Sequence, residues 1–213
     1  MAVTRWPAEA IWEAVAPTLP GFTVEVLPEI DSTNSELMRR ARAGQLEPVL
    51  LVAERQTAGR GRMGRVWDSR AGMDAAPDAD TGGPLPSLMF SLGLPLAPAD
   101  GSGLSLAVGV SVAESLDAAV GLKWPNDLWL AGDRKLGGIL VETASVVSPA
   151  PGAAALRYVV IGMGINITER LAQAGTGTTT PPAGLRELVP GIDAPTALAQ
   201  LVPALVATVQ AFE

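Results

Sequence analysis

The feature that most constrains this chain is an apolar run that leads directly into a glycine- and arginine-rich segment. Residues 49–53 are continuously apolar, which predicts a buried strand. The segment Gln56–Trp67 follows and reads QTAGRGRMGRVW, with three glycines and three arginines interleaved. Glycine lets a ligand approach bare backbone N–H groups, and arginine supplies planar, permanently charged donors. We therefore expect a buried strand that delivers a mobile loop able to close over an anion.

Taken alone, this segment does not identify the anion. A solvated basic turn is one alternative, because a single glycine-rich signal is weak. The pattern is not a P-loop, since no Gly-Lys-Ser/Thr sequence follows. A nucleic-acid surface is disfavoured because the chain has a net charge of −7, whereas a phosphate backbone requires a broad basic face.

The residue types that are missing restrict the chemistry. The 213 residues include no cysteine and no histidine, which excludes thiolate nucleophiles, Ser-His-Asp triads, disulfides and zinc sites with those ligands. Of the 15 lysines and arginines, only Lys123 and Lys135 are lysine, which draws attention to the segment that contains them. The sequence has neither a membrane-length apolar run nor a signal peptide, so we expect a cytoplasmic protein.

Periodicity predicts helices and strands interspersed along one domain. The predicted helices cover residues 7–16, 31–43, 102–120 and 195–212. The predicted strands cover residues 23–27, 49–53, 88–94, 128–130, 135–142 and 157–161. Low complexity predicts surface insertions at about 70–86, 143–156 and 173–184. At the second helix, Thr33 and Glu36 match a capping box.

Two neighbouring segments combine polar residues with turn signals. Asn126 and Asp127 follow Pro125 and precede an alternating Leu-Trp-Leu, so we expect them at the mouth of a strand, a usual place for site residues. Lys135 then begins the second strand of a hairpin, where Gly137–Gly138 indicates close approach by another group. An ordinary edge-strand lysine is the alternative for Lys135. A Gly-x-Gly at residues 162–164 also follows a strand, but no helix or third glycine completes a dinucleotide site.

These segments together resemble the catalytic domain of biotin protein ligase. One such motif would be a weak signal, but five in the family's order and roughly its spacing, over residues 25–170, are specific. The resemblance implies an α+β fold with a mixed, largely antiparallel sheet and flanking helices on one face, similar to class II aminoacyl-tRNA synthetases. The matching segments are Ser32–Asn34, Gln56–Trp67, Lys123–Asp127, Lys135–Glu142 and Gly162–Asn166.

The resemblance also implies a two-step, ATP-dependent reaction. The biotin carboxylate attacks the α-phosphate of ATP, giving biotinyl-5′-AMP and pyrophosphate. A lysine of a biotin carboxyl carrier protein then attacks the anhydride and releases AMP. Mg²⁺ is expected to accompany ATP through phosphate oxygens and waters, without a metal site of the chain's own. Such a hydrolysable anionic intermediate needs fixed positive charge and exclusion of water, which a closing Gly/Arg loop can supply.

By resemblance, the site residues fall into three groups. The catalytic group is Lys135, Arg62 and Asp127, with Lys135 neutralising the transition state and Asp127 orienting or deprotonating the acceptor amine. The biotin-binding group is Ser32, Thr33, Gln56, Gly59, Arg60 and Gly138. The group that binds ATP and the adenylate is Arg62, Arg65, Trp67, Asn126 and Asn166, with Trp67 near the adenine and Asn166 reading its edge.

The resemblance covers the catalytic core of the family. We expect one catalytic domain over residues 1–213, without the N-terminal helix-turn-helix or the C-terminal β-barrel of other members, and therefore no binding to DNA. A truncated form and a naturally reduced ligase both fit this pattern, and a monomer and a homodimer are both open. Thr168 stands where the family often has a second asparagine.

Two alternative functions remain open. One is a non-catalytic module that binds biotin or biotinyl-AMP, which Lys135 and the complete arginine loop disfavour because simple biotin retention does not require them. The other is a lipoate-type ligase of the same superfamily, although the motifs resemble the biotin branch. An octanoyl transferase of that superfamily would need a cysteine nucleophile, which the chain lacks.

Overall fold

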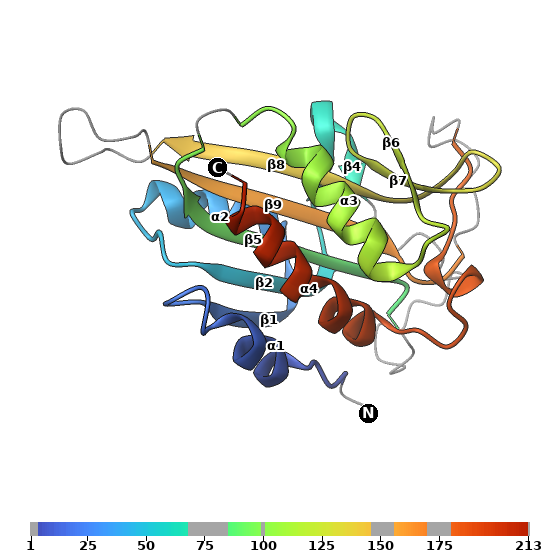
Figure 1. The fold of residues 1–213 in the computed structure, drawn as a ribbon, viewed down its shortest axis with the longest axis horizontal. Coiled ribbons are helices and arrows are strands. Elements are labelled where there is room, and N and C mark those ends of the chain that lie inside the picture. Colours follow the sequence, from blue (N-terminus) through green and yellow to red (C-terminus); the bar gives the residue numbers. More distant parts are fainter. Residues whose placement is uncertain (1–3, 68–84, 99–100, 146–155, 170–179, 213) are drawn as a thin grey trace.

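A seven-stranded sheet with helices on both faces organises the computed structural model, which describes residues 4–67, 85–98, 101–145, 156–169 and 180–212 (Figure 1). The helices are α1 (Ala8–Val15), α2 (Thr33–Arg42), α3 (Leu104–Leu116) and α4 (Ala194–Gln210). The strands of the sheet are β1 (Thr23–Ile30), β2 (Val49–Gln56), β5 (Ser87–Leu96), β6 (Gly121–Lys123), β7 (Asp127–Leu130), β8 (Arg134–Ser145) and β9 (Arg157–Asn166). A small hairpin pairs β3 (Gly59–Arg60) with β4 (Val66–Trp67) around the 3₁₀ turn Arg62–Gly64, and a second 3₁₀ turn covers Leu185–Glu187.

The strands lie in the order β1-β2-β5-β9-β8-β7-β6. Only β1 and β2 are parallel among the described strand pairs, because α2 crosses over between them; the other pairs are antiparallel. The long strands β5 and β9 pair along their whole length at the centre of the sheet. The predicted mixed, largely antiparallel α+β fold is confirmed.

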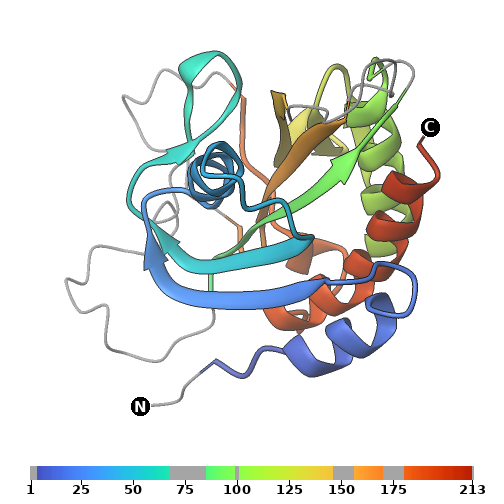
Figure 2. The ribbon, with the colours of Figure 1, turned by 90° about the vertical axis from the view of Figure 1, so that its left-hand side faces the viewer.

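One face of the sheet is aliphatic and is covered by α1, α3 and α4 (Figures 1 and 2). Alternate residues of β5 point into this core because successive side chains of a strand face opposite sides. They are Leu88, Phe90, Leu92 and Leu94, all at most 1% exposed. Helix α4 buries residues at spacings of three and four along its length, and its N-cap Asp193 accepts a hydrogen bond from the Thr196 N–H at 2.8 Å.

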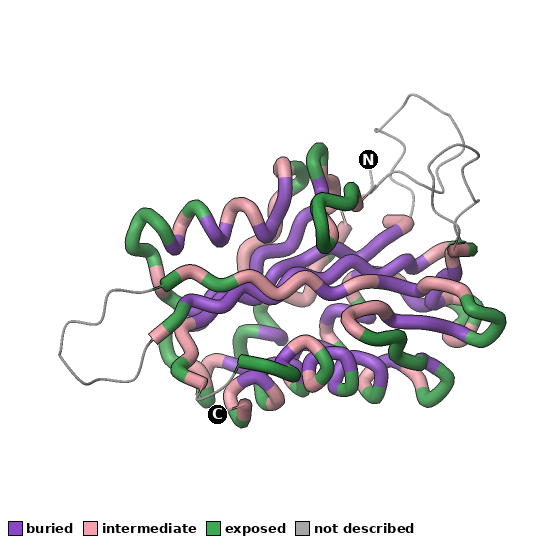
Figure 3. Tube along the Cα trace, turned by 90° about the horizontal axis from the view of Figure 1, so that it is seen from above, coloured by how far each residue is buried: buried purple, intermediate pink, exposed green. Residues whose placement is uncertain are grey.

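The opposite face is covered by α2 and the β3–β4 hairpin (Figure 2). Leu37 and Met38 of α2 pack against Leu51 of β2 and Val160 of β9 in a separate, smaller core. The expectation that all helices lie on one face is therefore wrong for α2, which carries its own apolar stripe. Figure 3 shows the buried strands between these two layers.

Several boundaries differ from the sequence prediction. Helix α3 is shorter than 102–120 because Gly103 is left-handed (φ 86°) and Asp117 is extended. Strand β9 continues to Asn166, so the Gly-x-Gly of residues 162–164 lies inside a strand. The predicted capping box is wrong: the N-cap of α2 is Ser32, whose Oγ lies 3.4 Å from the Ser35 N–H that it accepts.

The predicted insertions fall mainly at 68–84, 146–155 and 170–179, which lie outside the described residues. Residues 143–145 belong to β8. The surface prediction is wrong for Ala183 and Gly184, which are buried, whereas Pro181 is exposed. Pro182 forms a bridge with Lys135. Among the helices of the described residues, none has the length and apolar character to cross a membrane.

Candidate active site

Residues of the predicted site segments form two contact sets, of which the first begins at Gln56. Its Oε1 accepts from the Thr33 N–H at 2.8 Å and from the Thr33 hydroxyl at 3.3 Å. The buried Ser91 of β5 places its Oγ 2.7 Å from Thr33 Oγ1 and 2.6 Å from Asn34 Oδ1. The structure thus joins two of the predicted biotin-binding residues, Thr33 and Gln56, through direct hydrogen bonds.

The same contact set extends to the β3–β4 hairpin, which carries Arg60, Arg62 and Arg65 and is called the arginine hairpin below. Asn34, 3% exposed, donates from Nδ2 to Glu142 Oε2 at 3.0 Å and to the Leu140 carbonyl at 3.3 Å. Glu142 Oε2 also accepts from Arg60 Nη2 of β3. Gly162 of β9 leaves the room that the Asn34 amide occupies, because a methyl group there would overlap it.

Lys135 and Asp127 form the second contact set, at the junction of β7 and β8. Lys135 Nζ lies 2.7 Å from Asp127 Oδ1, and both side chains are mostly buried. A Cβ at Gly138 would lie 3.6 Å from each of these two atoms, so the glycine faces the pair directly. Asn126 is also ordered here, since its Nδ2 donates to the Ile139 carbonyl at 2.7 Å. The Trp124–Pro125 peptide bond before it is cis.

The backbone of Lys135 is fixed on both sides. Its N–H donates to the Pro181 carbonyl at 2.8 Å, and its carbonyl accepts from the Ala183 N–H at 2.9 Å. Asn166 Nδ2 donates to the Lys135 carbonyl at 3.3 Å and to the Ala183 carbonyl at 3.0 Å. Asn166 is therefore a buried brace for Lys135 in this structure, and its predicted contact with adenine stays a prediction.

Trp67 packs against β9, the strand that pairs with β8. A Cβ at Gly164 of β9 would lie 2.5 Å from the Trp67 ring, so the ring rests on bare backbone. Gly164 pairs with Gly138 of β8, which faces the Lys135–Asp127 pair. Two glycines side by side therefore let an aromatic ring and a charged pair approach the same part of the sheet.

The hairpin arginines differ in their contacts. Arg60 is held by Glu142, whereas Arg62 and Arg65 bind no other side chain among the described residues. Arg62 is the first residue of the 3₁₀ turn, and Arg65 is its C-cap. Gly59 pairs with Trp67 across the hairpin, and a Cβ at Gly59 would lie 2.5 Å from the Trp67 carbonyl oxygen. The predicted roles of these hairpin residues, and of Ser32 beyond its capping, stay predictions.

An ion-pair network fixes the turn that carries Ser32 and Thr33. Arg39 binds both oxygens of Asp31 at 2.7 and 3.0 Å, and Asp31 Oδ1 accepts from the Ser32 N–H at 2.7 Å. The hydrogen bond from Arg39 lowers the pKa of the Asp31 carboxyl below its usual value. The hydrogen bond from Arg40 likewise lowers the pKa of Glu36 in the first turn of α2.

The second lysine has a different environment. Lys123 Nζ lies 3.7 Å from the centroid of the Trp129 ring, which is a cation–π contact on β6 and β7. Within the described residues, no three Asp or Glu side chains are grouped so as to hold a metal ion.

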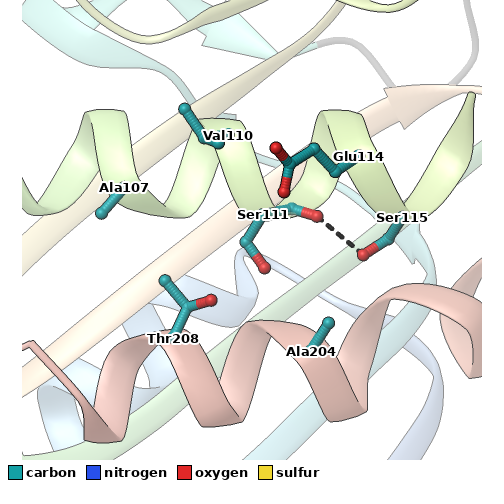
Figure 4. A pocket seen from close by; sticks show the side chains of 7 residues that line it. All are labelled: Ala107, Val110, Ser111, Glu114, Ser115, Ala204 and Thr208. Carbon is teal, nitrogen blue, oxygen red and sulfur yellow. Dashed lines mark hydrogen bonds between the residues drawn. The ribbon is translucent and has the colours of Figure 1, made fainter. Parts of the chain in front are cut away.

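A groove of about 470 Å³ lies on the other side of the sheet, between α3 and α4 (Figure 4). Most of its lining side chains are small, and Glu114 is the charged one among them. The Ser115 hydroxyl donates to the Ser111 carbonyl of its own helix at 2.7 Å. With no grouped catalytic side chains in its lining, this groove is a weaker site candidate than the α2 face.

Sequence reasoning missed three residues that connect the site. Asn34 and Glu142 lie inside two of the segments that match the family, but no role was predicted for them. Ser91 was not predicted to be a site residue. A signal for Ser91 was present, because a lone serine within the apolar run Leu88–Leu94 must satisfy its hydroxyl when buried. Its partners come from a helix far away in sequence, which no local pattern reveals.

Comparison with known proteins gives the same family as the motifs. The chain is 39% identical over 203 residues to the bifunctional ligase/repressor BirA of Escherichia coli, covering 92% of this chain and 56% of that protein. It is 36% identical over 157 residues to the biotin–[acetyl-CoA-carboxylase] ligase of Mycobacterium tuberculosis, covering 68% of this chain and 50% of that protein. The chain thus spans about half the length of these relatives. No protein-family model matches it.

A solved structure gives the same result for the fold. The biotin protein ligase of Aquifex aeolicus, in complex with biotin and ATP, superimposes with a TM-score of 0.61 at 26% identity, covering 89% of this chain and 71% of that one. The class II synthetase-like architecture implied by the motifs is thereby confirmed. The chain belongs to the biotin protein ligase family.

Proposed function

We propose that this chain catalyses ATP-dependent attachment of biotin to a lysine of a biotin carboxyl carrier protein, through biotinyl-5′-AMP. The observation that carries the proposal is the meeting of the Lys135–Asp127 pair, the Arg60 hairpin and the Thr33–Gln56 contacts on one sheet face. These groups supply cations for a carboxylate and a phosphate, together with neutral hydrogen-bonding groups for a polar ring. Relatives named as biotin ligases support the same reaction.

In the first step, the chain orients two anions against each other. Arg60 has donors beyond the Nη2 bound to Glu142, and these can receive the biotin carboxylate. Arg62 and Arg65 enclose the phosphates, while Lys135 lies against the α-phosphate oxygens and neutralises the charge that develops there. The ureido ring of biotin and its surroundings receive hydrogen bonds from Thr33, Gln56 and Ser32. Gly59 and Gly138 leave room for biotin. The adenine is contacted by Trp67 and Asn166.

In the second step, Asp127 changes partner. Lys135 Nζ lies 2.7 Å from Asp127 Oδ1. A phosphate bound to Lys135 weakens that pair and leaves the carboxylate to orient or deprotonate the incoming lysine amine. Asn126 lies beside Asp127 in the sequence and is placed to contact the phosphates. Mg²⁺, where present, would be held by ATP oxygens and water and would add charge neutralisation at the phosphates.

Both alternatives from the sequence are less well supported. A pure binding module does not need a lysine braced through its backbone on both sides. For the lipoate-type ligase, the named relatives are biotin ligases instead. A single catalytic domain, a cytoplasmic location and a monomeric or dimeric state remain part of the proposal.

Substitution of Asp127 separates the two steps. Asp127→Asn keeps the shape of the side chain but removes the charge that would bind the acceptor amine, so transfer should fall by about 10²-fold or more and adenylation by much less. The measurement is single-turnover biotin transfer to a carrier domain beside single-turnover formation of biotinyl-AMP. Equal losses in the two steps would contradict the role given to Asp127.

A further inference from the structure

Glu142 stands between the arginine hairpin and the rest of the site. It lies on β8, which is paired with β9 along most of its length and is therefore a rigid support. The hairpin has much less support of its own, since β3 and β4 pair at only two positions, Gly59 with Trp67 and Arg60 with Val66. A contact between the two elements should therefore matter more for the hairpin than for the sheet.

The Glu142 carboxylate is itself held from the side of α2. Asn34 Nδ2 donates to Glu142 Oε2 at 3.0 Å, and the orientation of that amide is fixed by Ser91 Oγ at 2.6 Å from its Oδ1. A second hydrogen of Nδ2 goes to the Leu140 carbonyl at 3.3 Å. Asn34 and Ser91 are almost fully buried, so the carboxylate has one preferred direction, toward Arg60.

The ion pair leaves most of Arg60 available. Glu142 accepts from Nη2, and the Nε and Nη1 donors bind nothing else in the described part of the chain. Neither Arg62 nor Arg65 forms an ion pair with a described residue. Of the three hairpin arginines, Arg60 is thus the one that ties the hairpin to the sheet.

We propose that Glu142 is a positioning residue for the biotin half of the site. Its carboxylate, oriented by Asn34, holds the Arg60 guanidinium and the hairpin over the residues that bind biotin. Through Asn34, Ser91 and Thr33 the same contacts reach Gln56, so the hairpin and the biotin-binding residues are one hydrogen-bonded unit. The expected effect of Glu142 on catalysis rests on the proposed ligase function. The attachment of the hairpin to the sheet through Glu142 does not depend on that function.

Glu142→Gln tests the proposal with little change in shape. The amide oxygen can still accept from Asn34, but the negative charge that attracts the Arg60 guanidinium is removed, which weakens the contact. Without any substrate, tryptic cleavage after Arg60, Arg62 or Arg65, located by mass spectrometry, should become about tenfold faster. In steady state the KM for biotin should rise about tenfold while kcat stays within about twofold, because Arg60 is less well placed but the reacting groups are intact.

Glu25→Gln is the matched control. Glu25 is also a strand glutamate bound by an arginine, Arg40, but it lies on β1 away from the hairpin. Its substitution should change neither the hairpin cleavage rate nor the KM for biotin. A second variant, Arg60→Gln, removes the same ion pair from an exposed side chain that cannot disturb the core. It should accelerate cleavage after Arg62 and Arg65 as much as Glu142→Gln does.

The outcomes separate the two proposals. Hairpin cleavage of Glu142→Gln and Arg60→Gln at the rate of the Glu25→Gln control would overturn the attachment. A lower KM for biotin in Glu142→Gln would overturn the positioning role, because Glu142 would then compete with the ligand for Arg60. If the unaltered chain shows no biotin-dependent reaction, the ligase function fails, while the cleavage rates still decide whether Glu142 holds the hairpin.

Discussion

The two faces of the central sheet are built from the same strands, and each has an apolar core, but only the α2 face combines that core with buried polar side chains and glycines. On β5, Leu88, Phe90, Leu92 and Leu94 enter an aliphatic core, whereas Ser91 between them binds Asn34 and Thr33 on the opposite face. On β9, Val159 and Ile161 enter that core, whereas Gly162 and Gly164 leave room for Asn34 and Trp67.

Within a single strand, the residues that face one side therefore stabilise the fold, and the residues that face the other side form the proposed site. The aliphatic face buries large side chains, which is the dominant favourable contribution to folding. The α2 face gives up side-chain volume at its glycines and buries polar groups, which is tolerated because those groups are hydrogen-bonded to one another. Substitutions on the two faces should therefore have different consequences, in activity on one and in stability on the other.

The largest effect is expected for Lys135→Ala on the polar face. Loss of the charge at the α-phosphate should slow adenylation by about 10³-fold with the fold intact, and Arg62→Ala should do the same. Single-turnover formation of biotinyl-AMP measures the loss, and thermal unfolding checks the fold. A near-normal rate for either purified variant would remove its assigned catalytic role.

Leu92→Ala should give the opposite result on the aliphatic face. Leu92 is fully buried, so its truncation should lower the free energy of unfolding by about 2–5 kcal/mol. Urea denaturation measures this change. The adenylation rate per folded molecule should remain near that of the unaltered chain; a tenfold fall in that rate would show that the two faces are not independent.

Gly164→Ala should produce a smaller change on the polar face. The added methyl would lie 2.5 Å from the Trp67 ring, so the ring must shift from its seat, and the KM for ATP should rise about tenfold or less. Gly101→Ala is the matched control, because a Cβ there meets nothing within 4 Å. An unchanged KM for ATP in the Gly164 variant would mean that the position of Trp67 does not affect nucleotide binding.

The smallest effect is expected for Asp31→Asn, which tests the support of the Ser32–Thr33 turn. Arg39 lowers the pKa of Asp31 in the folded protein, so this carboxylate stabilises the fold above its unfolded pKa of about 4 and loses that effect as the pH falls further. The variant should be less stable at pH 7 by at most about 1 kcal/mol, because the pair is exposed. Urea midpoints at pH 7 and pH 3 should show this deficit shrinking; a constant deficit would contradict the ion-pair explanation.

Prediction from the sequence succeeded where the signal was local. The apolar run 49–53 became part of β2, the predicted hairpin with Lys135 near the start of its second strand is formed by β7 and β8, and the helix predicted over residues 195–212 is α4. The order of the five motifs also predicted the α+β fold. Strand and helix ends were less accurate, as with α3, because caps depend on single backbone angles such as that of Gly103.

What the sequence could not provide was the pairing across distant segments. Nothing near Ser91 indicates that its partner is Asn34, nor does β8 indicate that Glu142 meets Arg60, 82 residues earlier. The location of α2 on the second face and the burial of Ala183 and Gly184 beside Lys135 are likewise set by tertiary packing. The individual site residues could be nominated from motifs, but their connections required the fold.

The most direct test of the central claim, that the polar face is a biotin-activating site, is pyrophosphate release from ATP by the purified 213-residue chain. We predict release that depends on biotin, is not supported by lipoate or octanoate, and is about 10³-fold slower in Lys135→Ala. Absence of release, with biotin still bound tightly in calorimetry, would contradict the account and indicate a binding module instead.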